Sequence, residues 1–389
     1  MEGLFVLLCI LFVANSCTNI SCARVGVFSA PEQNTFNVID YGAVGDGQFD
    51  DTQTFLTAWA DVCGATQGTP TLAIPEGKTF LLGPVAFQGP AKPLASIFSE
   101  QSARKGEDKW IQFSDISGLI INGSGEIDGQ GASWWESCKS SCQRPTALSI
   151  HKCNGSQLTG IRYLNSAKNH ISINSCSGVC VSQLQIIAPD ESPNTDGIDI
   201  SSSSNITIED SSIGTGDDCV AINGGTFNIN ISRVTCGPGN GMSIGSLGAH
   251  GKYETVEEVH VRDCKFIGSQ NGARIKTWDG GAGYARKISF ERIALENCRH
   301  PIIIDQYYFS DGKNPKESSV AVSDVSYLDV HGTSSDEKAI DLNCSKHGCI
   351  NIVLDHINIT SSVPGTNAYA ACNNANGTAA FAVPSVPCL

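Results

Sequence analysis

Positive charge is scarce in this chain. Its 389 residues include 25 Lys and Arg against 39 Asp and Glu, which gives a formal net charge of −14. A protein of this sign repels polyanions, so we predict no nucleic-acid partner. If the substrate is acidic, its charge must be met by a few Lys or Arg residues placed at the site, rather than by the field of the whole surface.

The apolar run near the amino terminus is too short to span a bilayer. This run, LFVLLCILFV, covers residues 4–13 and suits the hydrophobic part of a secretory leader better than a transmembrane helix. We therefore predict a signal peptide at residues 1–23, cleaved after a residue between 16 and 23, and a mature domain at 24–389. The protein is expected to be secreted, with no membrane partner. An amino-terminal anchor is the alternative, because the first residues, MEG, carry no Lys or Arg.

No two cysteines have the CxxC spacing of a zinc site, and we predict neither a metal nor a cofactor. Of the 17 cysteines, three lie at positions 9, 17 and 22, which leaves 14 in the mature chain. An even number suits disulfide bonds in an exported protein. The pairs Cys344 with Cys349 and Cys372 with Cys388 would close short local loops. Seven sequons of the predicted mature chain also fit passage through a secretory pathway: Asn122, Asn154, Asn205, Asn230, Asn343, Asn358 and Asn376.

Long helical periodicity is absent beyond about residue 115. The sequence returns there to one theme, a short β-branched segment followed by a turn rich in Gly, Asn, Ser or Asp. Taking Ile206, Ile229, Val259 and Ile288 as equivalent strand positions gives steps of 23, 30 and 29 residues. This irregular period favours stacked coils of a parallel β-helix over alternating βαβ units, with each coil burying its Ile, Val and Leu against the next.

A helix is predicted where the open end of such a stack needs a cover. Residues 50–63, DDTQTFLTAWADVC, have Asp50 as N-cap with Gln53 three residues on, and Gly64 can end the helix. Its apolar face would consist of Phe55, Leu56, Trp59 and Val62. We expect this helix to cap the amino-terminal end, and the disulfide-closed tail to finish the other. No low-complexity linker separates these two ends of the chain, so we predict a single all-β domain.

Polar motifs recur on successive coils. They are Asn194-Thr195-Asp196, then Asp217 and Asp218 in GTGDDC, Asn240 between two glycines, Arg274 and Lys276 in RIK, and Tyr308 in DQYY. Each motif alone is usually structural, since Asp and Asn cap turns and RIK suits a solvated strand face. Two adjacent acids point to opposite faces of a regular strand, so a shared site requires a bend at GTGDDC. Their coincidence on stacked coils predicts one site with acids in the middle and cations beside them.

The order of these motifs resembles the polygalacturonase family of glycoside hydrolases, family 28. FNVIDYGAVGDG from Phe36 and the segment GPGNGMSIGSLG look most similar to plant members, and more loosely to pollen-type exo-acting ones. The resemblance implies a right-handed parallel β-helix that hydrolyses α-1,4 bonds of polygalacturonic acid with inversion. It also implies a pectic polysaccharide as partner, an extracellular location in the cell wall, and a monomer.

The resemblance assigns roles to the polar residues. Asp217 would be the general acid, while Asp196 and Asp218 would hold and activate the water. Arg274 and Lys276 would bind a substrate carboxylate with Tyr308 hydrogen-bonding beside them, and Asn194 and Asn240 would complete the substrate contacts. Crowded acids raise the pKa of at least one member, which keeps a proton available. A Cys219–Cys236 disulfide would stiffen the bend.

Two alternatives remain from the sequence. Asn240 stands where the family normally has histidine, which predicts reduced turnover and leaves open a non-catalytic pectin-binding wall protein. A pectate lyase would share the β-helix, but the acid and cation motifs match hydrolases, and no separate calcium-type acid cluster stands out. The sequence does not decide between endo and exo attack.

Overall fold

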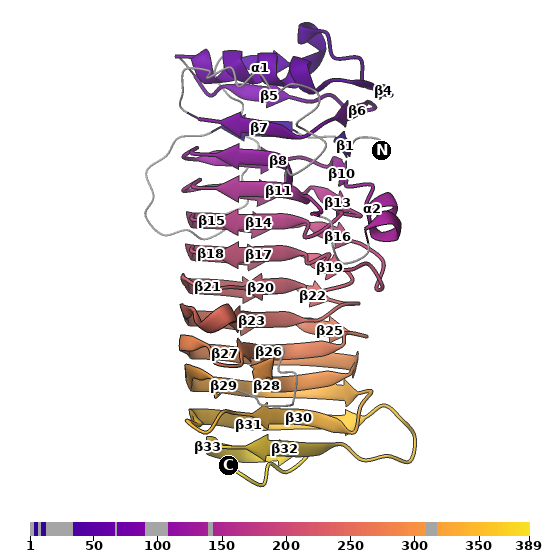
Figure 1. Cartoon of the computed structure of the whole chain (residues 1–389). Helices are drawn as coiled ribbons and strands as arrows, with labels where there is room; N and C mark the ends of the chain where they lie inside the picture. Colours follow the sequence, from indigo (N-terminus) through magenta and orange to yellow (C-terminus); the bar gives the residue numbers. More distant parts are fainter. Residues whose placement is uncertain are drawn as a thin grey trace. The chain divides into compact units, whose positions relative to one another are not determined.

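The computed structural model describes residues 4–6, 9–12, 34–66, 68–89, 108–138, 143–308 and 317–389. The chain forms two compact units, an amino-terminal unit (Met1–Thr195) and a carboxy-terminal unit (Asp196–Leu389). Within each unit, short strands are stacked coil upon coil and most of them run parallel (Figure 1). The all-β architecture is confirmed in both units. The extent of the mature domain, 24–389, stays a prediction.

The amino-terminal unit contains the helices and the first strands. Its helical elements are η1 (Val38–Tyr41), α1 (Thr52–Gly64) and α2 (Ala132–Ser137). Its strands are β1 (Leu4–Val6), β2 (Cys9–Phe12), β3 (Thr35–Asn37), β4 (Asp46–Asp50), β5 (Thr71–Ala73), β6 (Thr79–Leu82), β7 (Val85–Gln88), β8 (Lys109–Ser114), β9 (Leu119–Asn122), β10 (Glu126–Asp128), β11 (Thr146–His151), β12 (Gln157–Thr159), β13 (Arg162–Leu164), β14 (Ile171–Asn174), β15 (Ser177–Ser182) and β16 (Gln185–Ile187). Strands β7, β8, β11 and β14 form one parallel ladder, as do β9, β12 and β15.

The carboxy-terminal unit consists of parallel ladders and one short 3₁₀ turn, η2 (Ala249–Gly251). One ladder comprises β17 (Ile198–Ser201), β20 (Val220–Ile222), β23 (Met242–Leu247), β26 (Asn271–Trp278), β28 (His300–Tyr308), β30 (Lys338–Asn343) and β32 (Tyr369–Asn373). A second comprises β18 (Ser204–Glu209), β21 (Thr226–Ser232), β24 (Tyr253–Arg262), β27 (Ala282–Cys298), β29 (Ser319–Ser334), β31 (Cys349–Ser361) and β33 (Ala375–Val383). The short strands β19 (Ser212–Gly214), β22 (Thr235–Cys236) and β25 (Lys265–Ile267) form a third, which joins β27.

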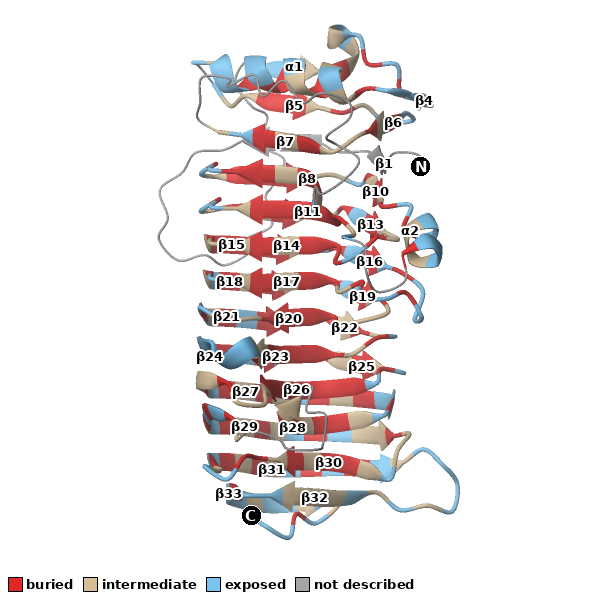
Figure 2. Cartoon of the chain, viewed as in Figure 1, coloured by how far each residue is buried: buried red, intermediate tan, exposed pale blue. Residues whose placement is uncertain are grey.

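The repeat read from the sequence sets the register of the second ladder. Ile206 pairs with Ile229, Ile229 with Val259, and Val259 with Ile288, so the predicted equivalent positions are confirmed. All four side chains are buried, within the buried interior that Figure 2 shows along the strands. Each such side chain stabilises the stack by about 1.5–3 kcal/mol relative to exposure. A slip of one residue would turn this column outward, so burial fixes the pairing.

Helix α1 covers one end of the amino-terminal unit, as predicted (Figure 1). The expected N-cap was wrong by one residue, because the helix begins at Thr52 and Asp51 occupies the cap position. The Asp51 carboxylate accepts hydrogen bonds from the backbone N–H groups of Val44 and Gly45, which holds it away from the helix. The helix ends at Gly64, as expected. Its buried face comprises Phe55, Ala58, Trp59 and Val62, and Leu56 is half-buried.

The predicted leader is only partly described. Strand β1 pairs antiparallel with β6 and β10, and β2 pairs antiparallel with β5 and β9. The rest of residues 1–23, including the predicted cleavage region from 16 to 23, lies outside the described residues, and the leader stays a prediction. Across the part of the chain that the structure describes, no helix has the length and apolar character needed to cross a membrane.

Both predicted local disulfides are formed, Cys344–Cys349 and Cys372–Cys388. The second ties β32 to the carboxy-terminal tail beyond β33, so the expected closure of that end is present. Within the described segments, free thiols are carried by Cys63, Cys153, Cys264 and Cys298.

Candidate active site

Four of the predicted site residues lie in loops of the carboxy-terminal unit, and Arg274, Lys276 and Tyr308 lie on its strands. Asp196 precedes β17, Asp217 and Asp218 lie between β19 and β20, and Asn240 lies between β22 and β23. Backbone hydrogen bonds hold these loops in contact. The N–H of Gly197 donates to the carbonyl oxygen of Asp218 at 2.8 Å, and that of Asn240 donates to the carbonyl oxygen of Asp217 at 2.8 Å. The polar motifs are therefore stacked, as their spacing predicted.

Two glycines allow this close stacking. A Cβ on Gly197 would lie 2.5 Å from the carbonyl oxygen of Cys219, and a Cβ on Gly239 would lie 2.5 Å from that of Asp217. Gly239 also has φ of +123°, a conformation that other residues rarely adopt. The Cys219–Cys236 disulfide, implied by the family resemblance, is formed and ties the bend to β22.

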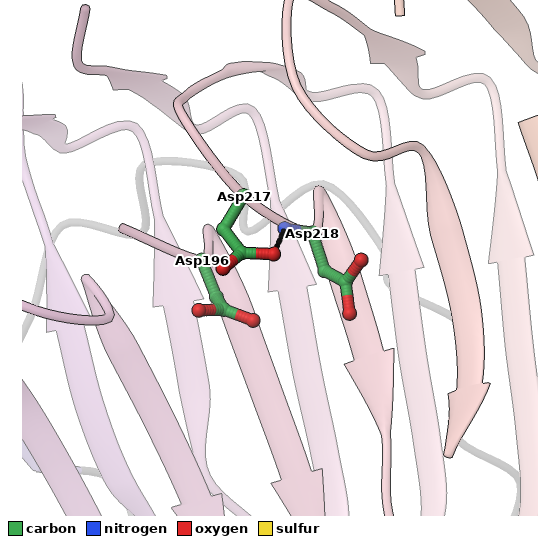
Figure 3. A group of neighbouring side chains, drawn as sticks. All are labelled: Asp196, Asp217 and Asp218. Atoms are coloured by element: carbon green, nitrogen blue, oxygen red, sulfur yellow. Dashed lines mark hydrogen bonds between the residues drawn. The ribbon is translucent and has the colours of Figure 1, made fainter. Parts of the chain in front are cut away.

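The bend at GTGDDC brings three carboxyl groups together. One oxygen from each of Asp196, Asp217 and Asp218 lies within 4.8 Å of the other two. Figure 3 shows the carboxylates of Asp196 and Asp217 next to each other, while that of Asp218 is directed away from them. The backbone N–H of Asp218 donates to Oδ1 of Asp217 at 3.0 Å. Two adjacent acids thus serve one site because the backbone turns between them.

The Asp218 carboxylate is bound on both oxygens by cations. Lys276 Nζ donates to Oδ2 at 2.7 Å, and Arg274 Nη2 donates to Oδ1. Ser243 Oγ also donates to Oδ1 at 2.9 Å, and it accepts from Arg274 Nε at 2.8 Å. Asp218 is 1% exposed, and Arg274 and Lys276 are each 7% exposed. The two cations, assigned above to a substrate carboxylate, therefore already have a partner within the protein.

Ser243 was missed by sequence reasoning. It lies on β23, directly opposite Arg274 of β26 in the ladder, and bridges that guanidinium to Asp218. The sequence signal that could have identified Ser243 is its position one coil before the RIK motif, in register with Arg274. A hydroxyl at this place supplies the acceptor that Arg274 Nε needs once it is buried.

Asp196 has a pKa raised well above its ordinary value. Burial is the main cause, and the negative charge of Asp199 adds to it. The charges of Asp217 and Asp218 raise the pKa further, whereas Lys276 acts in the opposite direction. The acid cluster therefore retains a proton more readily than an isolated aspartate does. The residue of the cluster on which this proton is favoured is Asp196. Asp199, on β17, was not singled out from the sequence.

Asn240 and Tyr308 complete the group. The side-chain amide of Asn240 donates from Nδ2 to Oδ1 of Asp217 at 2.9 Å. Tyr308, the last residue of β28, has its ring centroid 5.1 Å from Lys276 Nζ, a cation–π distance. Asn194 belongs to the amino-terminal unit, where its Oδ1 accepts a hydrogen bond from Arg144 Nη2 at 2.7 Å.

The spacing of the three acids would allow them to hold a metal ion. The charge balance opposes this use, because Asp218 is already neutralised by two cations that would repel a third. The donor set therefore fits proton chemistry better than cation binding.

Comparisons with known proteins give a consistent result. The family model described as Glycosyl hydrolases family 28 matches residues 63–382. An Arabidopsis thaliana protein named as a probable polygalacturonase is 47% identical over 388 residues, which covers 95% of this chain and 84% of that protein. An exopolygalacturonase of Zea mays is 37% identical over 374 residues, covering 91% and 90%. Among solved structures, a polygalacturonase from Erwinia carotovora matches with a TM-score of 0.68 and 25% identity, covering 91% and 99%. The expected right-handed parallel β-helix is thereby confirmed.

Proposed function

The chain belongs to glycosyl hydrolase family 28, and from this premise we propose that it hydrolyses α-1,4-galacturonosyl bonds of polygalacturonic acid with inversion. The observation that carries the proposal is the cluster of Asp196, Asp217 and Asp218 with two buried cations at its side. Glycoside hydrolysis needs a proton donor and a carboxylate in one place, and this cluster supplies both. The relatives named above act on the same class of substrate.

We assign the leaving-group proton to Asp217 and the positioning of water to Asp196 and Asp218. The assignment to Asp217 follows from its place in the GDD motif of the family. The raised pKa of Asp196 supports a proton held within the cluster and makes Asp196 the alternative donor. The two assignments predict different behaviour with activated substrates.

The charge balance supports an acidic substrate. Arg274 and Lys276 carry two positive charges, and Asp218 cancels one of them. This trio of residues keeps one positive charge, with Asp196 and Asp217 close to Asp218, in a chain whose net charge is −14. A galacturonate carboxylate at this place would be attracted by the surplus charge, and the hydroxyl of Tyr308 could donate a hydrogen bond to it.

The short separation of the acids bears on stereochemistry. Inverting glycosidases typically hold their carboxyl groups about 6.5–9.5 Å apart. Here the closest oxygens lie within 4.8 Å. Retention would require a carboxylate oxygen to attack the sugar, yet both oxygens of Asp218 are bound by cations, which weakens it as a nucleophile. We therefore retain water as the nucleophile and inversion as the outcome.

The proposal is tested with purified protein and de-esterified polygalacturonate. We expect new reducing ends to appear. We also expect NMR to show that the first product has the inverted anomeric configuration. We propose exo attack, as in the maize relative, so monomers should appear with little loss of viscosity. Products that absorb in the ultraviolet would indicate a lyase instead. Binding of the polymer without any new reducing ends would favour the non-catalytic wall protein.

We further propose that the protein acts outside the cell, on pectic polysaccharide of the wall, as a monomer. The support is the leader-like run in the sequence together with the named activities of the plant relatives. Gel filtration of the secreted protein, and its recovery in a wall fraction, would test both points.

Replacing Asn240 by His is expected to raise turnover on polygalacturonate at mildly acidic pH. Asn240 Nδ2 donates to Asp217, but an amide cannot exchange a proton with it. An imidazole at this place could return a proton to Asp217 after each turnover. The measurement is kcat between about pH 4 and pH 7, with Tm as a control for folding. A fully active parent whose kcat is unchanged by the substitution would show that the histidine is dispensable here.

A further inference from the structure

Three aromatic rings form a row of successive neighbours that begins at Lys276, beside the acid cluster. Lys276, whose Nζ binds Asp218 at 2.7 Å, lies 5.1 Å from the ring centroid of Tyr308. The ring of Tyr308 lies 6.4 Å from that of Trp278, in an edge-to-face arrangement. The ring of His250 follows, with its centroid 5.4 Å from that of Trp278. The site therefore continues beyond Tyr308 along two side chains to which no role has been given.

The protein fixes this row in place. Trp278 Nε1 donates to Ser246 Oγ at 2.9 Å, which sets the orientation of the indole. His250 lies in η2, next to the turn that follows β26. The backbones of these two loops touch, because a Cβ added to Gly248 would lie 2.5 Å from Cα of Gly281. Rings held in this way lose little further freedom when a ligand binds, which favours affinity.

The rings of Tyr308, Trp278 and His250 are not packed into the hydrophobic core. Trp278 and Tyr308 are half-buried and His250 is exposed, whereas large aromatic residues such as Phe290 and Tyr327 are fully buried. Figure 2 shows the short turn after β23, which holds His250, as exposed. Aromatic side chains that remain accessible beside a charged cluster are typical of ligand sites.

The chemistry of this row fits a galacturonosyl ring. In a galacto-configured sugar the axial O4 lies on one face, and the hydrogens on C3, C4 and C5 gather on the other. This weakly positive, apolar face suits the negative face of an indole ring. The sugar also carries a carboxylate, to which a ring nitrogen of His250 can donate a hydrogen bond. A single galacturonosyl residue can thus contact both Trp278 and His250.

We infer that Trp278 and His250 form a further sugar-binding subsite, which holds the galacturonosyl residue beyond the one contacted by Lys276 and Tyr308. The inference rests on the proposed function for the identity of the ligand. Trp278 and His250 would then set a preference for longer substrates, because only a chain that extends beyond Tyr308 can contact them.

The test compares digalacturonate with tri- and tetragalacturonate, using the parent, Trp278→Ala, Trp278→Phe and His250→Ala. Loss of the indole is expected to raise KM about two- to tenfold for the longer substrates, with kcat little changed, since such contacts contribute about 0.5–1.5 kcal/mol. Digalacturonate should be affected much less, and Trp278→Phe should recover part of the loss. Tyr253→Ala removes an aromatic side chain that is 72% exposed and lies on β24, and it serves as the matched control.

Binding is measured separately, by calorimetry with trigalacturonate in the Asp217→Asn background. If no protein cleaves the chain but Trp278→Ala weakens binding about two- to tenfold, the subsite stands and the proposed activity falls. If the parent cleaves normally, and neither KM nor Kd changes in Trp278→Ala for any length, the inference is overturned. An equal loss of kcat on all lengths also overturns it, since Trp278 would then act by positioning Tyr308 and Lys276.

Discussion

Asp217→Asn is expected to lower turnover on polygalacturonate by about 10²–10⁴-fold while the protein stays folded. The change removes the proposed proton donor and alters almost no volume. Asn can still accept the hydrogen bonds that Asp217 Oδ1 takes from the backbone of Asp218 and from Asn240. The loop should therefore keep its shape. The measurement is kcat from reducing ends, with circular dichroism and Tm as checks on the fold.

A second substrate distinguishes Asp217 from Asp196 as the donor. An aryl galacturonide with an acidic phenol needs no proton on its leaving oxygen, so the general-acid variant should recover most of its rate on it. Asp217→Asn should recover in this way and Asp196→Asn should not, because Asp196 is assigned to the water. The Asp217 substitution also removes a negative charge that raises the pKa of Asp196, so Asp196 is protonated less often and is less available as a substitute donor.

Two results would contradict this assignment. One is a folded Asp217→Asn variant that keeps more than about a tenth of parent turnover, since general acid catalysis contributes far more than this. The other is recovery on the aryl substrate by Asp196→Asn alone, which would transfer the role of donor to Asp196.

The parts of the fold that depend on burial were predictable from the sequence. The column of Ile206, Ile229, Val259 and Ile288 was found from its turn-separated repeat, and the ladder pairs these residues in that register. Buried β-branched side chains leave one workable pairing, so the pattern carries the information. The start of α1 was missed because Asp51 binds the backbone of Val44 and Gly45, a tertiary contact that capping rules do not include.

The proximity of the acids, the cations and Tyr308 was likewise predictable, but Ser243 and the internal pairing of the charges were not. Spacing placed the acids, the RIK cations and Tyr308 on successive coils. Which charge neutralises which depends on side chains far apart in the chain, since Lys276 and Asp218 are 58 residues apart. Trp278 and His250 were not recognised as neighbours for the same reason, because their contact requires the loop after β23 to pack against the turn after β26.

The network around Asp218 leads to the largest expected effect on stability. Asp218→Asn would leave Arg274 and Lys276 buried without the carboxylate that both now bind. The NH2 group of the new amide could also face the N–H donors of one of these cations. Removing one partner of a buried ion pair typically costs about 3–5 kcal/mol, because the remaining charge stays desolvated. Asp196 and Asp217 are near enough to offset part of this cost. We therefore expect a loss of about 3 kcal/mol in the free energy of unfolding, together with loss of turnover.

The matched control is Asp210→Asn, which breaks an ion pair with Arg233 on the outer surface, where the two side chains are 45% and 48% exposed. Water already solvates those charges, so this variant should unfold close to the parent midpoint. Denaturant unfolding, monitored by fluorescence, measures both variants. Adding Lys276→Met to Asp218→Asn removes one of the stranded cations, and it should recover part of the lost stability. If Asp218→Asn is no less stable than Asp210→Asn, the cations do not depend on Asp218. In that case they are held for the substrate carboxylate, as the family resemblance first implied.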